Sequence, residues 1–81
     1  MYSFRIITHK NGKKVDIIDN SASYPTKQEA VKAAQYAADY WHLVHGKYNG
    51  ELQFNISGAT RWFTDELGNS YCREYKVIAC Q

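Results

Sequence analysis

The stretch Thr26-Lys27-Gln28-Glu29, followed by the alanine-rich run from Ala30 to Val44, decides the fold of this chain. A threonine followed three residues later by a glutamate is a capping box, in which each side chain satisfies a free backbone N–H group at the start of a helix. Alanine has the highest helix propensity of all residues. The stretch therefore predicts one long helix, from about Lys27 to His45, with Gly46 as the glycine that ends it.

One side of this helix is apolar at helical spacing, and such a face is typical of a helix that packs on the rest of a domain. The opposite side is polar and is expected to lie in water. Tyr36 and Tyr40 lie one turn apart beside the apolar face. The apolar face consists of Ala30, Ala34, Ala37, Trp41 and Val44, and the polar face of Gln28, Lys32, Gln35, Asp39 and His42.

The sequence before the helix predicts a β-hairpin. Residues 2–9 and 13–19 alternate in side-chain character, and Asn11-Gly12 between them is the dipeptide that a two-residue type I′ turn prefers. Such a turn sets the register of the two strands. The cross-strand pairs expected from it are Lys10–Lys13, Thr8–Val15 and Ile6–Ile17, with the last two pairs on the core face.

The sequence after the helix predicts three more strands, over residues 51–57, 61–64 and 71–80. The first of them alternates with Leu52, Phe54 and Ile56 pointing inward. Loops or turns are expected at residues 48–50, at Gly58-Ala59-Thr60 and at residues 65–70. The order β-β-α-β-β-β predicts a single α+β domain over residues 1–81, with a mostly antiparallel sheet of four or five strands and one helix packed on one face.

The composition indicates binding more than catalysis. The 81 residues include seven tyrosines, three phenylalanines and two tryptophans, which is more than so small a core can hide. Exposed tyrosine and tryptophan are enriched at protein interfaces. The net charge of +2 permits contact with nucleic acid but is smaller than the basic excess that DNA-binding domains usually show.

We expect a cytoplasmic protein that makes no contact with a membrane. No apolar run approaches the roughly 20 residues of a membrane span, and the N-terminus is too short and polar for a signal peptide. Cys72 and Cys80 fall on one predicted strand, about 26 Å apart at roughly 3.3 Å per residue. A disulfide requires Cα atoms within about 7 Å, so two free thiols are expected, which suits a reducing compartment.

No catalytic residue, cofactor, metal site or small-molecule substrate is expected. His42 and His45 lie three residues apart and could present two imidazoles to a metal, but zinc needs further ligands. Cys72 could act as a nucleophile only with a base and an orienting acid beside it. Histidines near a helix C-terminus are favoured by the helix dipole, and free buried cysteines commonly behave as small hydrophobic residues.

Two features are candidates for contact with a partner. Three lysines converge on the predicted hairpin tip, where they could meet phosphates or an acidic protein surface. Trp62 and Phe63 are adjacent in a strand and must point to opposite faces, so one of them needs a second layer or is exposed. The residues assigned to partner binding are Lys10, Lys13, Lys14, Tyr36, Tyr40, Arg61, Trp62 and Arg73.

The segment Tyr24-Pro25-Thr26 with Glu29-Ala30 resembles the strand-to-helix entry of several small bacterial and phage domains of uncharacterised function. The whole layout is similar to that of small phage anti-CRISPR proteins, including a late Trp-x-x-Asp segment at Trp62 to Asp65. The resemblance implies an inhibitor that occludes a functional surface of a larger host protein or nucleoprotein complex. The alternative is a nucleic-acid-binding module, with Arg61, Arg73 and Lys76 on an open sheet face contacting phosphates and aromatic rings stacking on bases.

Overall fold

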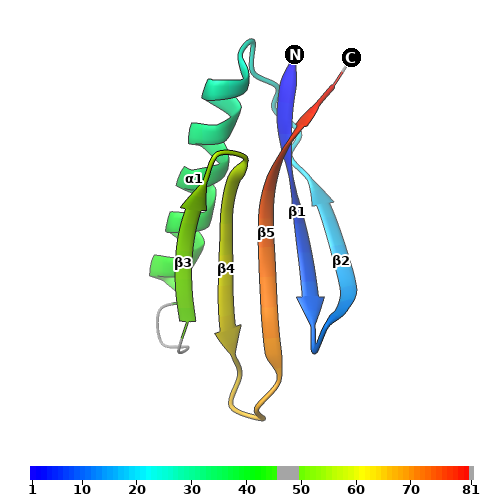
Figure 1. The fold of residues 1–81 in the computed structure, drawn as a ribbon, viewed down its shortest axis with the longest axis vertical. Coiled ribbons are helices and arrows are strands. Elements are labelled where there is room, and N and C mark those ends of the chain that lie inside the picture. Colours follow the sequence, from blue (N-terminus) through cyan, green and yellow to red (C-terminus); the bar gives the residue numbers. More distant parts are fainter. Residues whose placement is uncertain (46–49, 81) are drawn as a thin grey trace.

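The computed structural model describes residues 1–45 and 50–80, which form one five-stranded sheet and one helix (Figure 1). All neighbouring strands are antiparallel, and their order in the sheet is β2-β1-β5-β4-β3. The expected α+β arrangement is confirmed. The expected helix-ending Gly46 and residues 48–49 of the expected loop lie outside the described residues. The elements are β1 (Tyr2–Lys10), β2 (Lys13–Asp19), α1 (Lys27–Val44), β3 (Gly50–Asn55), β4 (Gly58–Thr64) and β5 (Ser70–Ala79).

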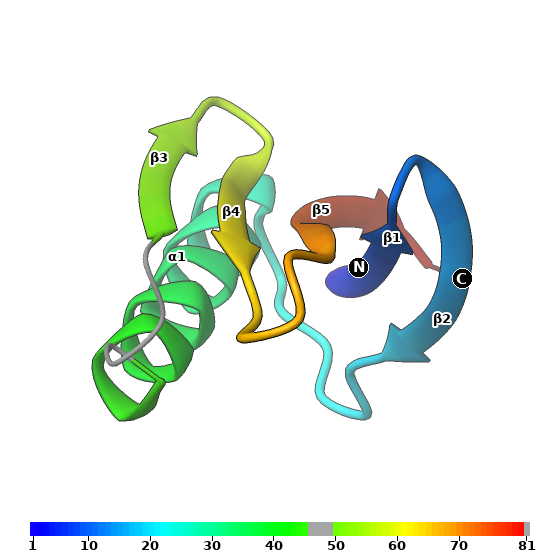
Figure 2. The ribbon, with the colours of Figure 1, turned by 90° about the horizontal axis from the view of Figure 1, so that it is seen from below.

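The helix covers one face of the sheet and carries the chain from one edge to the other. It packs chiefly on β4 and β5, and also contacts β1 and β3. Figure 2 shows α1 lying against β3 and β4, with β2 at the far edge of the curled sheet. All seven residues of β2 are exposed, so this edge strand lies beyond the cover of the helix.

The core lies between α1 and the middle of the sheet. Phe4 of β1, Ala59 of β4 and Tyr75 of β5 meet Ala34 and Ala38 of the helix there. Alanine side chains allow the helix backbone to come close to the sheet, because they fill little of the space between the two layers. The predicted packing of the helix on one face of the sheet is therefore confirmed.

The start of the helix is as predicted, and its buried face is as predicted in part, since Ala30 and Ala34 are buried and Ala37 and Trp41 are half-buried. Thr26 is the N-cap, and its Oγ1 accepts a hydrogen bond of 3.2 Å from the backbone N–H of Glu29. The fully buried helix residues are Ala30, Ala34 and Ala38, whereas Val44 is exposed.

The buried side of α1 therefore extends to Gln35 and His42, which are half-buried. The prediction that both lie in water was wrong. Gln35 Nε2 donates to the backbone oxygens of Asn55 and Gly58, at 3.2 Å each. His42 is half-buried and accepts a hydrogen bond from the sheet. Polar side chains can face a sheet where they find such partners, and this cannot be seen in the helical pattern alone.

The hairpin has the expected turn but a different register. Asn11 and Gly12 have φ of 50° and 85°, as the type I′ turn requires, and Lys10 pairs with Lys13. A β-bulge then leaves Val15 without a partner and shifts all later pairs by one residue. The predicted pairs Thr8–Val15 and Ile6–Ile17 are therefore wrong, and the pairs present are Thr8–Asp16, Ile7–Ile17 and Ile6–Ile18.

The turn between β3 and β4 falls at Ile56-Ser57, not at the predicted Gly58-Ala59-Thr60. Ile56 is 88% exposed, so its assignment to the inner face of a strand is also wrong. Gly58 starts β4 with φ of 142°, and a Cβ atom there would lie 1.9 Å from the carbonyl oxygen of Tyr75. This glycine is needed for the close approach of two strands rather than for a turn.

Cys72 of β5 and Cys80, directly after that strand, are both free, as expected. Within residues 1–45 and 50–80, no helix is long and apolar enough to cross a membrane.

Candidate binding surface

The face of the sheet opposite the helix, called the open face below, carries a row of side chains that crosses all five strands. Strand pairing places these residues side by side, and side chains at paired positions point to the same face. Trp62 and Cys72 form the centre of the row. From β3 to β2 the row reads Glu51, Trp62, Cys72, His9 and Lys14.

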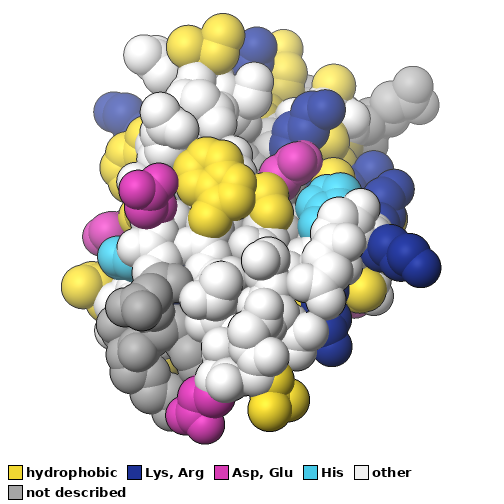
Figure 3. All heavy atoms as spheres, turned by 60° about the horizontal axis from the view of Figure 1, so that its bottom comes forward, with side chains coloured by type: hydrophobic (Ala, Val, Ile, Leu, Met, Phe, Trp, Pro, Cys, Tyr) yellow, Lys and Arg dark blue, Asp and Glu magenta, His cyan; other side chains and the backbone are white. Residues whose placement is uncertain are grey.

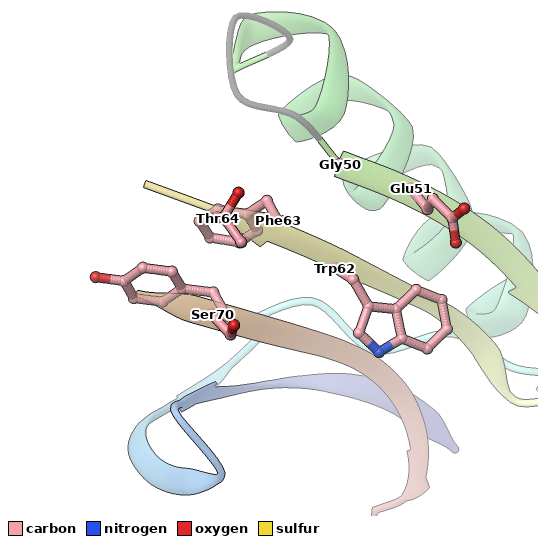
Figure 4. Close-up of a pocket in the computed structure, with 7 residues that line it drawn as sticks. Gly50, Glu51, Trp62, Phe63, Thr64 and Ser70 are labelled. Atoms are coloured by element: carbon pink, nitrogen blue, oxygen red, sulfur yellow. The ribbon is translucent and has the colours of Figure 1, made fainter. Parts of the chain in front are cut away.

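Trp62 is the large apolar side chain at the centre of this face, and it is 41% exposed. Grooves of about 390 and 280 Å³ lie beside it and share Trp62, Ser70 and Tyr71 as walls. In Figure 4 the indole projects from β4, the strand between those that carry Glu51 and Ser70. The first groove is also lined by Gly50, Glu51, Phe63 and Thr64, and the second by His9, Gly12, Cys72 and Glu74.

Polar and acidic groups surround the indole. His9 Nε2 lies 3.8 Å from Glu74 Oε1, across the β1–β5 pair. Figure 3 shows a hydrophobic side chain on this end of the molecule with acidic side chains and a histidine around it. Burial, and secondarily the negative charge of Glu74, raises the pKa of the Cys72 thiol. A raised pKa leaves a smaller fraction of the thiol as thiolate at neutral pH, and the thiolate is the reactive form of cysteine.

The open face carries charges of both signs. Arg5 and Asp19, two rows further along, form an ion pair with 2.6 Å between Nε and Oδ1. The hydrogen bond from Arg5 lowers the pKa of Asp19. Lys76 is paired with Arg5 in the register, while Glu51 and Glu74 lie near Trp62. The open face is therefore not a uniformly basic surface.

Arg61 and Arg73 do not lie on this face, which corrects the expectation that they contact phosphates there. They are paired across β4 and β5 on the helix side of the sheet. Arg61 is fully buried, and its Cζ lies 4.7 Å from the Trp41 ring centroid and 4.8 Å from that of Phe63. Arg73 Cζ lies 4.5 Å from the Trp41 ring centroid. Both guanidinium groups thus contact the indole of Trp41.

Arg61 fastens the end of the helix to the sheet. Its Nε donates to His42 Nδ1 at 2.8 Å, and its Nη2 donates to the backbone oxygen of His45 at 3.4 Å. Its Nη1 is buried and has no hydrogen-bond partner among the described residues. Burial lowers the pKa of Arg61, and the nearby positive charge of Arg73 lowers it further. Arg61 is therefore a structural residue that a partner cannot reach.

The lysine tip, Lys10, Lys13 and Lys14, is held by a neighbouring turn. Lys13 and Lys14 are exposed, whereas Lys10 is half-buried with its Nζ 5.9 Å from the ring centroid of Tyr71. Asn11 Nδ2 donates to Asn69 Oδ1 at 3.1 Å, which joins the tip to the turn between β4 and β5. No local pattern predicts this contact, because the two asparagines are 58 positions apart.

That second turn is organised by Asp65. Its Oδ1 accepts hydrogen bonds of 2.9 Å from the backbone N–H groups of Leu67 and Asn69. Its Oδ2 accepts from Asn69 Nδ2 at 3.0 Å and from the Tyr71 hydroxyl at 3.1 Å. These bonds, those from Asn69 above all, lower the pKa of Asp65. Aspartate is a residue type that turns favour, so Asp65 could have been assigned to this turn from the sequence. Its role as the acceptor of the turn's hydrogen bonds was not predicted.

The remaining candidates lie elsewhere. Tyr36 and Tyr40 are exposed on α1, which covers the other face of the sheet, so the structure does not bring them together with Trp62. Within the part of the chain that the structure describes, no group of three or more His, Cys, Asp or Glu residues could hold a metal ion. No protein-family model, curated protein or solved structure matches this chain.

Proposed function

We propose that this chain is a non-catalytic binding domain that contacts a larger protein through its open face. The observation that carries this proposal is Trp62, a tryptophan exposed between two grooves on a rigid sheet. Tryptophan is among the residues most enriched at the energetic centres of interfaces. Trp62 lies on a strand that is paired on both sides, so its backbone loses little conformational freedom on binding.

A protein partner suits the charges of this face better than nucleic acid does. Two of the three cations assigned to phosphate contact, Arg61 and Arg73, lie beneath the helix. Carboxylates of Glu51 and Glu74 line the grooves beside Trp62 and would repel a phosphate backbone. Mixed charges around an aromatic centre are typical of the rim of a protein interface.

The mechanism would be occlusion. A domain of this kind binds a functional surface of its partner and blocks access to it, with no chemistry of its own. The architectural resemblance to small phage anti-CRISPR proteins supports a host protein or nucleoprotein complex as the target. The lysine tip would then adjoin the contact, because Lys14 ends the row of residues that contains Trp62.

The test is a pull-down from host lysate with three baits: the wild-type chain, Trp62→Ala and Ile56→Ala. Ile56 is even more exposed than Trp62 but lies in the turn between β3 and β4, so it serves as the matched control. We expect a stoichiometric protein partner with wild type and Ile56→Ala that is lost with Trp62→Ala. Equal capture by all three baits, or capture of nucleic acid alone, would contradict the proposal.

A further inference from the structure

Each of the two grooves beside Trp62 contains one carboxylate side chain. Glu51 lines the first groove and Glu74 the second, and Trp62 is a wall of both. No lysine or arginine among the described residues lines either groove, although the whole chain has a net charge of +2. The exposed indole is therefore the centre of a negative area on a chain that is positive as a whole.

Both carboxylates belong to neighbours of Trp62 in the sheet. Glu51 lies directly opposite Trp62 in the β3–β4 pair, so their Cβ atoms are about 4.5–5.5 Å apart. Glu74 comes two residues after Cys72, the residue opposite Trp62 on β5, which makes it a diagonal neighbour at about 7–8 Å. Figure 4 shows the Glu51 side chain on β3 beside the indole on β4. A group that lies on the indole is thus within reach of both carboxylates.

The chain itself does little to neutralise these two charges. Glu51 is exposed and is in no ion pair with another described residue. Glu74 has His9 as its neighbour, with 3.8 Å between His9 Nε2 and Glu74 Oε1, and the histidine is charged only when it is protonated. Lys14 ends the same row, but three strand spacings separate it from Trp62, about 14 Å at roughly 4.8 Å each. Salt screens charges over about 8 Å, so this lysine does not cancel the charges beside the indole.

A partner that covers Trp62 must therefore deal with the carboxylates. An ionised carboxylate that is buried without a counter-charge costs more free energy than an apolar contact returns. A cation avoids this cost, since it pairs with the carboxylates and is attracted to the face of the indole. Arginine suits both contacts, because its planar guanidinium stacks on an aromatic ring and still donates hydrogen bonds from its edge.

We propose that the protein partner carries an arginine side chain that stacks on the Trp62 indole and pairs with Glu51 and Glu74. This inference rests on the proposed function, because it takes Trp62 as the centre of the contact, and it adds the chemistry of the partner's side. The row also gives the contact a direction, since it runs from an anion at Glu51 to a cation at Lys14. The basic part of the partner then lies over β3 and β4, and any acidic part lies toward the hairpin tip.

The experiment is a titration at low salt with two short peptides. One is acetyl-Gly-Gly-Arg-Gly-Gly-amide, and the other has citrulline, the neutral isostere of arginine, in the central position. The chain has two tryptophans, so the indole N–H region of a ¹H–¹⁵N spectrum reports Trp62 and Trp41 separately, and Trp62→Phe identifies the Trp62 signal. We expect the arginine peptide to shift this signal with a dissociation constant in the millimolar range, and the citrulline peptide to bind at least about fivefold more weakly.

Charge-neutralising variants locate the site. Glu51→Gln and Glu74→Gln should each weaken binding of the arginine peptide by about two- to fivefold and leave binding of the citrulline peptide unchanged. Asp39→Asn makes the same change of net charge on the exposed side of α1, away from the open face, and should bind both peptides as wild type does. An unchanged Trp41 signal in each variant shows that the fold is intact.

Three results would overturn the inference: equal binding of the two peptides, no shift of the Trp62 signal with about 20 mM arginine peptide, or arginine binding that both glutamine variants leave unchanged. The proposed function would survive each of them as long as Trp62→Ala still abolishes capture in the pull-down, and the contact would then be with a neutral surface. Equal capture by wild type and Trp62→Ala overturns the proposed function, and this inference with it.

Discussion

Arg61 of β4 donates a hydrogen bond of 2.8 Å from Nε to Nδ1 of His42 in the last turn of α1. His42 must therefore present an unprotonated Nδ1 to the guanidinium. The ion-pair partner usual for a buried arginine is absent within the described residues, and aromatic rings of Trp41 and Phe63 lie against the cation instead. The end of the helix is thus held to the sheet by hydrogen bonds from Arg61 to the His42 imidazole and to the His45 backbone oxygen, and by a set of ring contacts.

We predict that His42→Ala lowers the free energy of unfolding by about 1–3 kcal/mol, because it leaves Arg61 Nε buried without an acceptor. Urea unfolding of the two proteins measures the difference. Arg61→Met is the informative companion variant, since it removes the buried charge and keeps an unbranched side chain of comparable length. In the Arg61→Met background, His42→Ala should cost much less. Equal costs in both backgrounds would show that the hydrogen bond contributes nothing.

Asp65 should make stability depend on pH in the acidic range. Its hydrogen bonds lower the pKa of Asp65 in the folded chain below the value of about 3.9 for an unfolded aspartate. The stabilisation is therefore fully present above that unfolded value and is lost as the pH falls through the folded pKa. Asp65→Asn should be less stable than wild type at pH 7, and the difference should shrink by pH 3. A difference that stays constant between these pH values would exclude this origin.

The capping threonine gives a prediction for the helix. Thr26→Ala removes the oxygen that accepts from the Glu29 N–H group, which should cost on the order of 1 kcal/mol. In a domain of this size the melting temperature should fall by roughly 4–8 °C. Thr26→Ser keeps the acceptor and should melt close to wild type. A Thr26→Ala chain that melts at the wild-type temperature would show that the cap does not stabilise the helix.

Cys72 should react more slowly than an ordinary thiol, and neither cysteine should be in a disulfide. Thiol titration of the unfolded chain should count two thiols, because Cys72 and Cys80 are free. In Cys80→Ser, the remaining Cys72 should react more slowly in the folded chain than in urea at the same pH, since burial raises its pKa. Faster reaction in the folded chain would indicate an activated thiol and would reopen the question of cysteine chemistry in the groove.

The sequence was sufficient for the parts of the fold that depend on neighbours along the chain. The Thr26–Glu29 cap, the Asn11-Gly12 turn and the number of strands all follow from local patterns. The bulge at Val15 was not predictable in this way, because the alternation of residues 13–19 is compatible with either register. Ile56 was misplaced because it continues an alternation that the turn interrupts.

The candidate surface was only partly predictable, because it depends on contacts between elements that are distant in the sequence. Adjacent rings at Trp62 and Phe63 required one of them to leave the core, but the choice depended on which face the helix covers. Arg61 has the charge and strand position of a surface residue. It is buried because Trp41 comes from another element to cover it, and no pattern along β4 encodes that contact.

The lysine tip can now be tested in two parts, because its lysines are not equivalent. Lys13 and Lys14 are exposed, so reversing both to glutamate should change the free energy of unfolding by less than about 0.5 kcal/mol. Lys10→Glu should cost more, since it removes the cation near the Tyr71 ring.

If the tip contributes to binding, the Lys13/Lys14 variant should associate more slowly with the partner captured through Trp62, and that rate should lose its salt dependence. Surface plasmon resonance at low and high salt measures both effects. Wild-type association kinetics at low salt would mean that the two lysines only protect an exposed turn and edge strand, and the tip would then have no part in binding.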